Sequence, residues 1–238
     1  MREVYEKLSF SNGMTAEQRL AEVQKFDRLN KLIQQIADVL VETNASAASE
    51  INASLGIVYE SNFNWVAEQV PELKEVTKTE SNKDAKETIS PFQKIAIDKA
   101  KDKSQVTNNV ANKLISAFVQ GATIGAVFNA VRKSVEENLN SATTISTNAV
   151  TRTENIARTN AATLAGRYYP VKKEWVAVMD DRTRDAHAEA NGQIVDIEKP
   201  FIVWGEKLQF PGDIVGSVQN TINCRCTTRF IFDKDTKK

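Results

Sequence analysis

The sequence predicts an α+β protein, in which a mainly helical region, residues 1–170, precedes a small α+β module, residues 171–238. Along most of the first region, apolar residues recur at steps of three and four, the period of an amphipathic helix. From residue 172 onward they gather in short runs punctuated by glycine and proline, which is typical of strands and turns. The sequence contains no internal repeat.

The first predicted helix begins at a capping box, Thr15-Ala-Glu-Gln18, in which a hydroxyl and an amide side chain bond the free amides of the first turn. Its apolar face carries Leu20, Val23, Phe26, Leu29, Leu32, Ile33, Ile36, Val39 and Leu40. A second helical stretch, about 46–70, carries Ile51, Leu55, Val58, Tyr59, Phe63 and Val66. These faces must be buried, either against each other or in part against a partner subunit.

A polar segment near 71–90 is dense in Lys, Glu, Ser and Thr, and we expect a mobile excursion or a solvated helix end there. Helix resumes after Pro91 and ends at Gly121, and Thr123 is a suitable N-cap for the next helix. After a polar patch at 138–147, one more helix is predicted, which ends at Gly166 and Pro170.

The module is predicted to open with a strand over 174–179, followed by a short helix within 180–191 that Gly192 ends. Two strand-like runs follow, Ile-Val-Asp-Ile and Phe-Ile-Val-Trp, within 194–204. The last predicted strand covers 224–232 and begins at the cysteines.

Charge and composition argue against several classes of protein. The 238 residues hold 31 basic and 31 acidic side chains, so the basic surplus typical of a protein that coats DNA is missing. No apolar run reaches the length that spans a bilayer, and the N-terminus lacks the apolar core of a secretory signal. We therefore expect no membrane partner, and synthesis in the cytoplasm.

The only histidine and the only two cysteines, His187, Cys224 and Cys226, all lie in the module. Cysteines one residue apart close too small a loop to form a disulfide scaffold. Together the three residues offer three ligands of the type that zinc prefers, and Asp181, Asp185 or water could supply a fourth. The alternative is a hydrogen-bonded histidine beside two buried thiols.

Signs of catalysis are absent from the sequence. A cysteine with His187 and an aspartate could imitate a thiol hydrolase, but no glycine-rich turn presents either cysteine. The sequence has no phosphate-binding glycine loop, zinc-protease helix motif or dinucleotide fingerprint. It also lacks the two glutamates, one residue apart, that an ADP-ribosyltransferase would use. We predict that the protein is not an enzyme.

An ordered set of motifs resembles the phage Mu F-like, or head morphogenesis, family. The set comprises Arg152-Thr-Glu154, Trp175, Asp181-Arg-Thr-Arg184, His187, Gly192, Phe210-Pro-Gly-Asp213 and Asn223-Cys-Arg-Cys226. The resemblance is specific over about 150–230 and only general over 1–150.

The resemblance implies a structural minor head (capsid) protein of a tailed phage or prophage. Such a protein is synthesised in the host bacterial cytoplasm and acts inside the phage head, near the portal, where it assists head assembly or the handling of packaged DNA. The implied partners are the portal protein and capsid or scaffold proteins, with packaged double-stranded DNA as a further candidate. We expect the helical half to dock, because its long apolar faces exceed what a short bundle needs.

The resemblance also bears on metal binding. Many relatives carry two cysteines three apart before the glycine and a histidine three residues before Cys-Arg-Cys. By spacing, Arg184 and His187 occupy the first pair here, and Thr221 the later histidine. Since Arg184 would repel Zn²⁺, we expect it to clamp Asp181 or Asp213 instead. We therefore expect no cofactor, with zinc as the alternative. In place of a metal, we predict a polar network of Asp181, Arg182, Arg184, His187 and Asn223.

Two other functions compete with this interpretation. A DNA-binding protein of the phage head would bind duplex DNA in a salt-sensitive manner. A phage-delivered effector enzyme would need a further catalytic domain, for which the matched module leaves little room.

Overall fold

The computed structural model describes residues 14–24, 27–73, 85, 87–90, 93–94, 98, 102–120 and 124–236. The chain divides into two compact units, each built from two separate segments. The first unit comprises residues 1–49 and 97–143, and the second comprises residues 50–96 and 144–238.

Helices dominate the N-terminal region, as predicted. They are α2, Ala16–Gln24, α3, Asp27–Ala67, α5, Lys103–Val119, and α6, Ile124–Ala165, with a 3₁₀ turn at Pro71–Leu73. The capping box at the start of α2 is confirmed: the Gln18 amide donates to Thr15 Oγ1 at 3.2 Å, and the Thr15 amide donates to Gln18 Oε1 at 2.9 Å.

Two predicted helix boundaries are wrong. The first predicted helix, up to Leu40, and the second, from about residue 46, are parts of the single helix α3. Helix α6 continues through the polar patch at 138–147, where the sequence predicted a break. This patch has no glycine or proline to stop a helix, and Ser141 Oγ bonds the Glu137 carbonyl one turn back, at 3.0 Å. Polar side chains therefore lie along a continuous helix instead of forming a loop.

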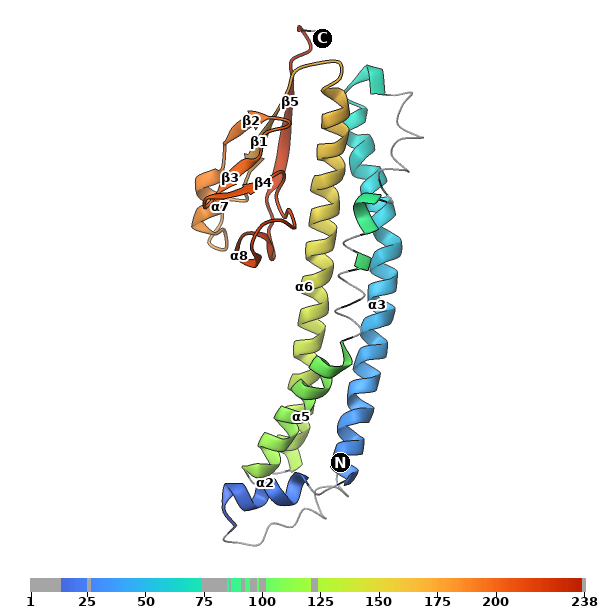
Figure 1. The fold of residues 1–238 in the computed structure, drawn as a ribbon, viewed down its shortest axis with the longest axis vertical. Helices are drawn as coiled ribbons and strands as arrows, with labels where there is room; N and C mark the ends of the chain where they lie inside the picture. Colours follow the sequence, from blue (N-terminus) through green and yellow to red (C-terminus); the bar gives the residue numbers. More distant parts are fainter. Residues whose placement is uncertain are drawn as a thin grey trace. The chain divides into compact units, whose positions relative to one another are not determined.

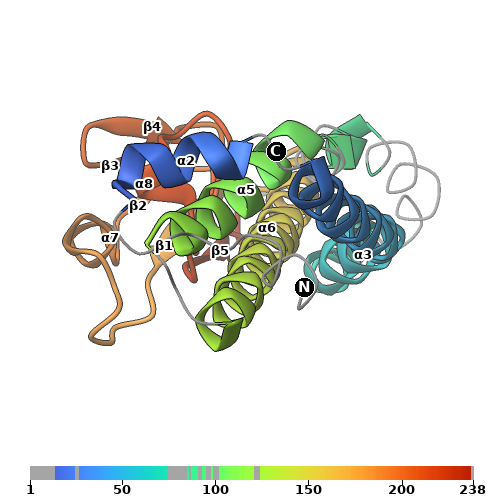
Figure 2. The same ribbon diagram turned by 90° about the horizontal axis from the view of Figure 1, so that it is seen from below.

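The first unit has its own core between α3, α5 and α6. Its buried members are Leu29, Ile33, Leu40, Val110, Leu114 and Val127. Beyond this core, Asn44 and Asn138 exchange two side-chain hydrogen bonds, of 3.0 and 2.8 Å. Helix α2 lies against α5, where Arg19 Nη1 donates to the Val119 carbonyl at 3.4 Å (Figure 2).

The second unit contains the remaining parts of α3 and α6. Large residues of α3, Leu55, Tyr59 and Phe63, are buried in the same cluster as Ala157 and Ala161 of α6. Small alanines let a neighbouring helix approach closely, so large and small side chains interdigitate. Ile89, in the segment predicted to be a polar excursion, is buried in this cluster as well, whereas residues 74–84 and 86 lie outside the described part.

The C-terminal module, which belongs to the second unit, adds a small sheet. Strands β1, Val171–Val176, β2, Ile194–Asp196, and β5, Thr227–Phe232, form an antiparallel sheet in the order β2-β1-β5. Strands β3, Phe201–Val203, and β4, Glu206–Leu208, form a hairpin. Two short helices, α7, Asp185–Ala190, and α8, Val218–Thr221, complete the module (Figure 1). The α+β class is thus confirmed.

Details of the module differ from the sequence prediction. Strand β5 begins at Thr227, so the cysteines precede the strand instead of opening it. Helix α8 was not predicted, because its four residues are too few to show a helical period. Gly192 has a φ of +80° just after α7, which agrees with its predicted role as the end of that helix.

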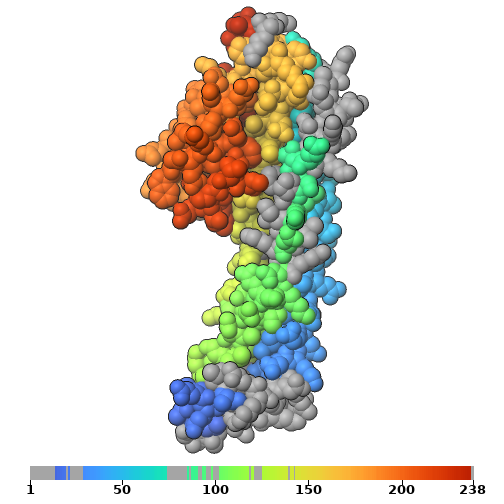
Figure 3. All heavy atoms as spheres, in the orientation of Figure 1, coloured from blue at the N-terminus to red at the C-terminus, as the bar shows by residue number. Residues whose placement is uncertain are grey.

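The module is compact and lies beside the C-terminal part of α6 (Figure 3). A separate core fills it, built from Trp175, Ala177, Ala190, Phe201, Val203, Leu208, Cys224 and Cys226. None of the helices in the described part of the chain combines the length and the apolar character that crossing a membrane requires.

Candidate functional site

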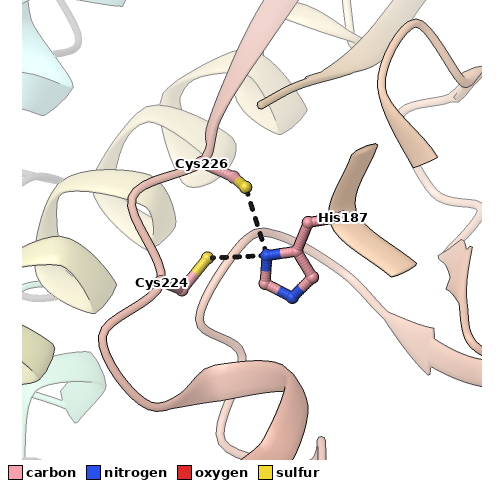
Figure 4. A group of neighbouring side chains, drawn as sticks. All are labelled: His187, Cys224 and Cys226. Atoms are coloured by element: carbon pink, nitrogen blue, oxygen red, sulfur yellow. Dashed lines mark hydrogen bonds between the residues drawn. The ribbon is translucent and has the colours of Figure 1, made fainter. Parts of the chain in front are cut away.

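The module brings together the three residues that the sequence singled out. His187 comes from α7, whereas Cys224 and Cys226 come from the segment between α8 and β5. His187 Nδ1 lies 3.3 Å from Cys226 Sγ and 3.8 Å from Cys224 Sγ, so both sulfurs face the same ring nitrogen (Figure 4). The three side chains are buried, and their candidate ligand atoms all lie within 4.8 Å of one another.

The opposite nitrogen of the ring orients His187. Its Nε2 lies 3.1 Å from the carbonyl oxygen of Asn220, on α8. A carbonyl can only accept a hydrogen bond, so the neutral ring carries its proton on Nε2 and turns the lone pair of Nδ1 toward the sulfurs. Trp175 packs edge-on against the ring, with 5.7 Å between centroids. The imidazole is therefore fixed in both position and tautomer.

Backbone and indole N–H groups surround the two sulfurs. The amides of Cys226 and Val178 lie near the sulfurs of Cys224 and Cys226 respectively, and each lowers the pKa of the thiol that it faces. The Trp175 indole N–H also lies near the Cys226 sulfur and acts in the same direction. Trp175 is fully buried, yet its Nε1 has no hydrogen-bond partner of regular geometry. The site thus offers donors suited to a thiolate.

The two thiols titrate as a pair. A hydrogen bond from the Cys226 thiol is the main cause that lowers the pKa of Cys224. Conversely, the proximity of Cys224 together with burial raises the pKa of Cys226. The pair therefore releases one proton far more readily than the second.

An ion pair joins the two segments that carry the site. Arg225, between the cysteines, donates to both carboxylate oxygens of Asp180, at 2.6 and 2.5 Å. Asp180 also accepts the amide of Arg182, at 3.0 Å, and so shapes the turn before α7. The Arg225 guanidinium is the main reason that the pKa of Asp180 lies far below its usual range.

Helix α6 holds the other side of the site. Arg152 Nε donates to the Gly212 carbonyl at 2.9 Å. One turn on, Asn155 Nδ2 lies 3.2 Å from the carbonyls of both Pro211 and Cys226. The Arg152 motif and the Pro-Gly-Asp motif, sixty residues apart, are therefore two sides of one contact.

The predicted polar network has a different arrangement in the structure. Asp181 is exposed, and Arg182 Nη2 lies 3.9 Å from Asp180 Oδ2. Arg184 Nη2 donates to the Ile222 carbonyl at 2.5 Å. The Asn223 amide donates to Asn148 Oδ1 at 2.6 Å, and Asn223 has a φ of +51°. Among the five residues, only His187 lies in the buried cluster.

The clamp expected between Arg184 and Asp181 or Asp213 is not formed, and Arg225 with Asp180 makes it instead. Asp213 already accepts the Gln209 and Val215 amides of its own loop, at 2.9 and 3.2 Å. Sequence reasoning missed Asp180, Arg225, Asn155 and Asn220. The position of Arg225 between the two cysteines was a signal that could have identified it. Its partner, Asp180, is 45 residues away, and only the fold brings the two together.

Thr221, which takes the place of the relatives' later histidine, is buried and donates to the Ser217 carbonyl at 2.9 Å. In the described part of the chain, no carboxylate joins the cluster of His187, Cys224 and Cys226. The arrangement is chemically suited to hold a soft or borderline cation through two sulfurs and one imidazole.

Comparison with known proteins gives two findings. Residues 108–229, about half of the chain, match the family described as "Phage Mu protein F like protein". A 63-residue stretch is 36% identical to NAD(+)--arginine ADP-ribosyltransferase EFV of Enterococcus faecalis, which covers 26% of this chain and 13% of that protein. No solved structure matches the chain.

Proposed function

Because the chain belongs to the phage Mu protein F like family, which indicates a phage head morphogenesis protein, we propose that it is a structural minor head protein associated with the portal inside the head. The observation that carries this proposal is the extent of the family match, which runs from α5 through the module to β5. The protein acts in assembly or in the handling of packaged DNA, in the virion of a tailed phage or prophage.

A structural function, not an enzymatic one, fits the site. Both cysteines are buried, at 2% and 4% exposure, so neither sulfur is presented to a substrate in the way that a nucleophile requires. The likeness to the ADP-ribosyltransferase of Enterococcus faecalis spans 13% of that protein, a small part of its length. The chain also lacks two glutamates one residue apart.

Exposed apolar side chains support docking on a protein subunit. Thirteen large apolar residues are exposed in the described part of the chain, and nine of them belong to the module. Trp204, at 71% exposure, occupies the β3–β4 turn with a φ of +49°, which is uncommon for a bulky residue. Glu206, on the strand that follows the turn, accepts the Ser217 backbone amide at 2.9 Å, so the segment that carries Val215 and Val218 lies against β4. Val215 and Val218 are 74% and 69% exposed.

We propose that Trp204, Val215 and Val218 together form a docking patch, and that it suits a protein partner better than DNA. No charged residue occurs between Asp213 and Arg225, whereas the electrostatic part of DNA affinity comes from lysine and arginine placed at phosphates. Exposed tryptophan is enriched among the residues that dominate binding energy in protein interfaces. We therefore propose that the portal contact lies in the module, whereas the sequence favoured the helical half.

Co-expression with a portal protein from the same phage or prophage tests the proposal. We expect the two proteins to co-purify, and the protein to be detected by mass spectrometry in purified particles. Trp204→Ser should weaken the association at least tenfold, whereas Val39→Ser, at an exposed apolar residue of the first unit, should leave it unchanged. No co-purification, together with absence from particles, would overturn the function. If Val39→Ser weakened the association and Trp204→Ser did not, the contact would lie on the helices instead of the module.

A further inference from the structure

We infer that His187, Cys224 and Cys226 form a zinc-binding site that ties α7 to the segment before β5. Neither the family match nor the proposed head function carries this inference, and it stands or falls without them. It rests on the positions of three ligand atoms, on the groups around them and on the charge of the resulting complex.

The distances suit a tetrahedral ion. With Zn–S of about 2.3 Å and Zn–N of about 2.0 Å, a tetrahedral site separates sulfur from nitrogen by about 3.5 Å. In the structure, the Nδ1 to Sγ separations of 3.3 and 3.8 Å lie on either side of this value. Shifts of a few tenths of an ångström would bring all three atoms into contact with one ion.

The surroundings match those of metal ligands. Histidine ligands of metals usually donate their other ring N–H to a carboxylate or carbonyl, as the Nε2 of His187 does toward the Asn220 carbonyl, 3.1 Å away. On the sulfur side, the Nε1 of Trp175 is buried and lacks a partner of regular geometry, although it lies near Cys226. A zinc-bound thiolate is a stronger acceptor than a thiol and would satisfy this donor.

Charge favours the complex inside the module. Zn²⁺ with two thiolates and a neutral imidazole has no net charge, so its burial avoids the cost of an isolated ion. Binding to two thiols releases two protons to solvent, or one where a thiol is already ionised. Without metal, the single lone pair of Nδ1 can accept only one of the two S–H groups.

The ion would also serve the fold. The module has a small core of its own, and small modules often gain stability from a structural metal. His187 and Cys224 are 37 residues apart, so one ion would fix two segments that are distant in sequence. Since no carboxylate joins the cluster in the described part of the chain, we expect water at the fourth position. The Arg184 guanidinium, the cation expected to repel zinc, is directed to the Ile222 carbonyl.

Metal analysis of the full-length protein tests the site. The protein is purified without chelator after removal of any histidine tag, and its zinc is measured by plasma mass spectrometry. We expect about one zinc per chain, and a chelator should lower the melting temperature. A preparation without zinc that also fails to take up added Zn²⁺ at micromolar concentration would overturn the proposal.

Variants separate ligand loss from unfolding. Cys224→Ser, Cys226→Ser and His187→Asn should each lower the zinc content at least tenfold. Val203→Ala is the matched control, because it trims the same core but leaves every ligand in place. Retention of zinc in Cys226→Ser, or its loss in Val203→Ala, would refute the assignment.

If the ligand variants fail to fold, the absorption spectrum of the wild-type protein loaded with Co²⁺ tests the site instead. Co²⁺ bound by two thiolates in a tetrahedral site gives intense visible bands and sulfur-to-cobalt charge transfer. We expect both features, and their loss when zinc is added in equimolar amount. A weak spectrum of octahedral type, without charge transfer, would overturn the proposal.

Discussion

Arg225 and Asp180 form a two-point ion pair across 45 residues of sequence, with N–O distances of 2.6 and 2.5 Å. The pair locks the segment that bears both cysteines to the turn that precedes His187. It is partly exposed, so its contribution to stability depends on geometry more than on burial.

The first prediction follows from the lowered pKa of Asp180, which Arg225 chiefly causes. A carboxyl with a depressed pKa in the folded state stabilises the protein above its unfolded pKa of about 3.9. This stabilisation is lost as the pH falls through the folded pKa. Melting curves between pH 6 and 2 should therefore show a smaller acid-induced drop for Asp180→Asn than for the wild type. Asp181→Asn, at the exposed neighbour, should behave as the wild type does.

A second prediction concerns Lys173, a fully buried amine on β1. Its Nζ donates to the carbonyl and the side-chain oxygen of Gln209, both at 2.9 Å. Burial lowers the pKa of Lys173 from 10.5 to about 8, although Asp213 partly opposes the shift. Between these pH values the unfolded chain binds more protons, so the free energy of unfolding should rise with pH.

The measurement compares denaturant unfolding of the wild type and Lys173→Met from pH 7.5 to 10.5. The difference between them should shift in favour of the wild type by at most about 1.4 kcal/mol per pH unit. Lys172→Met changes the exposed neighbouring residue and should track the wild type throughout. A difference that is constant over this range would show that Lys173 keeps an ordinary pKa.

A third prediction concerns Gly212, whose φ is +83° and whose added Cβ would lie 3.3 Å from Arg152 Cγ. Gly212→Ala should destabilise the protein by about 1–3 kcal/mol, because the backbone conformation disfavours a side chain and the Arg152 contact must shift. In Gly56→Ala, the new methyl meets nothing within 4 Å on α3, and about 0.5–1 kcal/mol of stabilisation is expected. Urea unfolding of both variants provides the check, and equal effects would contradict the account.

A fourth prediction concerns Asn155, which is 2% exposed and bridges the Pro211 and Cys226 carbonyls. Asn155→Ala removes the donor from both carbonyls and should cost about 1–3 kcal/mol. Asn140→Ala, at an exposed position of the same helix, should change stability by a few tenths of a kcal/mol at most. If Asn155→Ala were as mild as this control, the amide would not be what joins α6 to the cysteine segment.

Local patterns were sufficient for much of the fold. The sequence predicted the capping box at Thr15, the apolar faces of α3 and α5 and a strand near β1. Each of these depends only on residues that lie close together in the sequence. Two predicted boundaries were wrong: the break within α6 and the strand that was to begin at Cys224. Both depend on what packs against the segment. A polar patch without glycine or proline stays helical when its flanks are buried on both sides.

By itself, the sequence determined the α+β class, the family resemblance and the candidate ligands His187, Cys224 and Cys226, because these depend on residue type, order and spacing. Only the tertiary structure decided that Asp180 rather than Asp181 carries the ion pair, and that its partner is Arg225 rather than Arg184. Adjacent aspartates look equivalent along the chain, whereas the turn before α7 directs only one of them toward the cysteine segment. An ion pair between residues 45 positions apart depends on the direction in which each side chain points, and sequence spacing does not determine that direction.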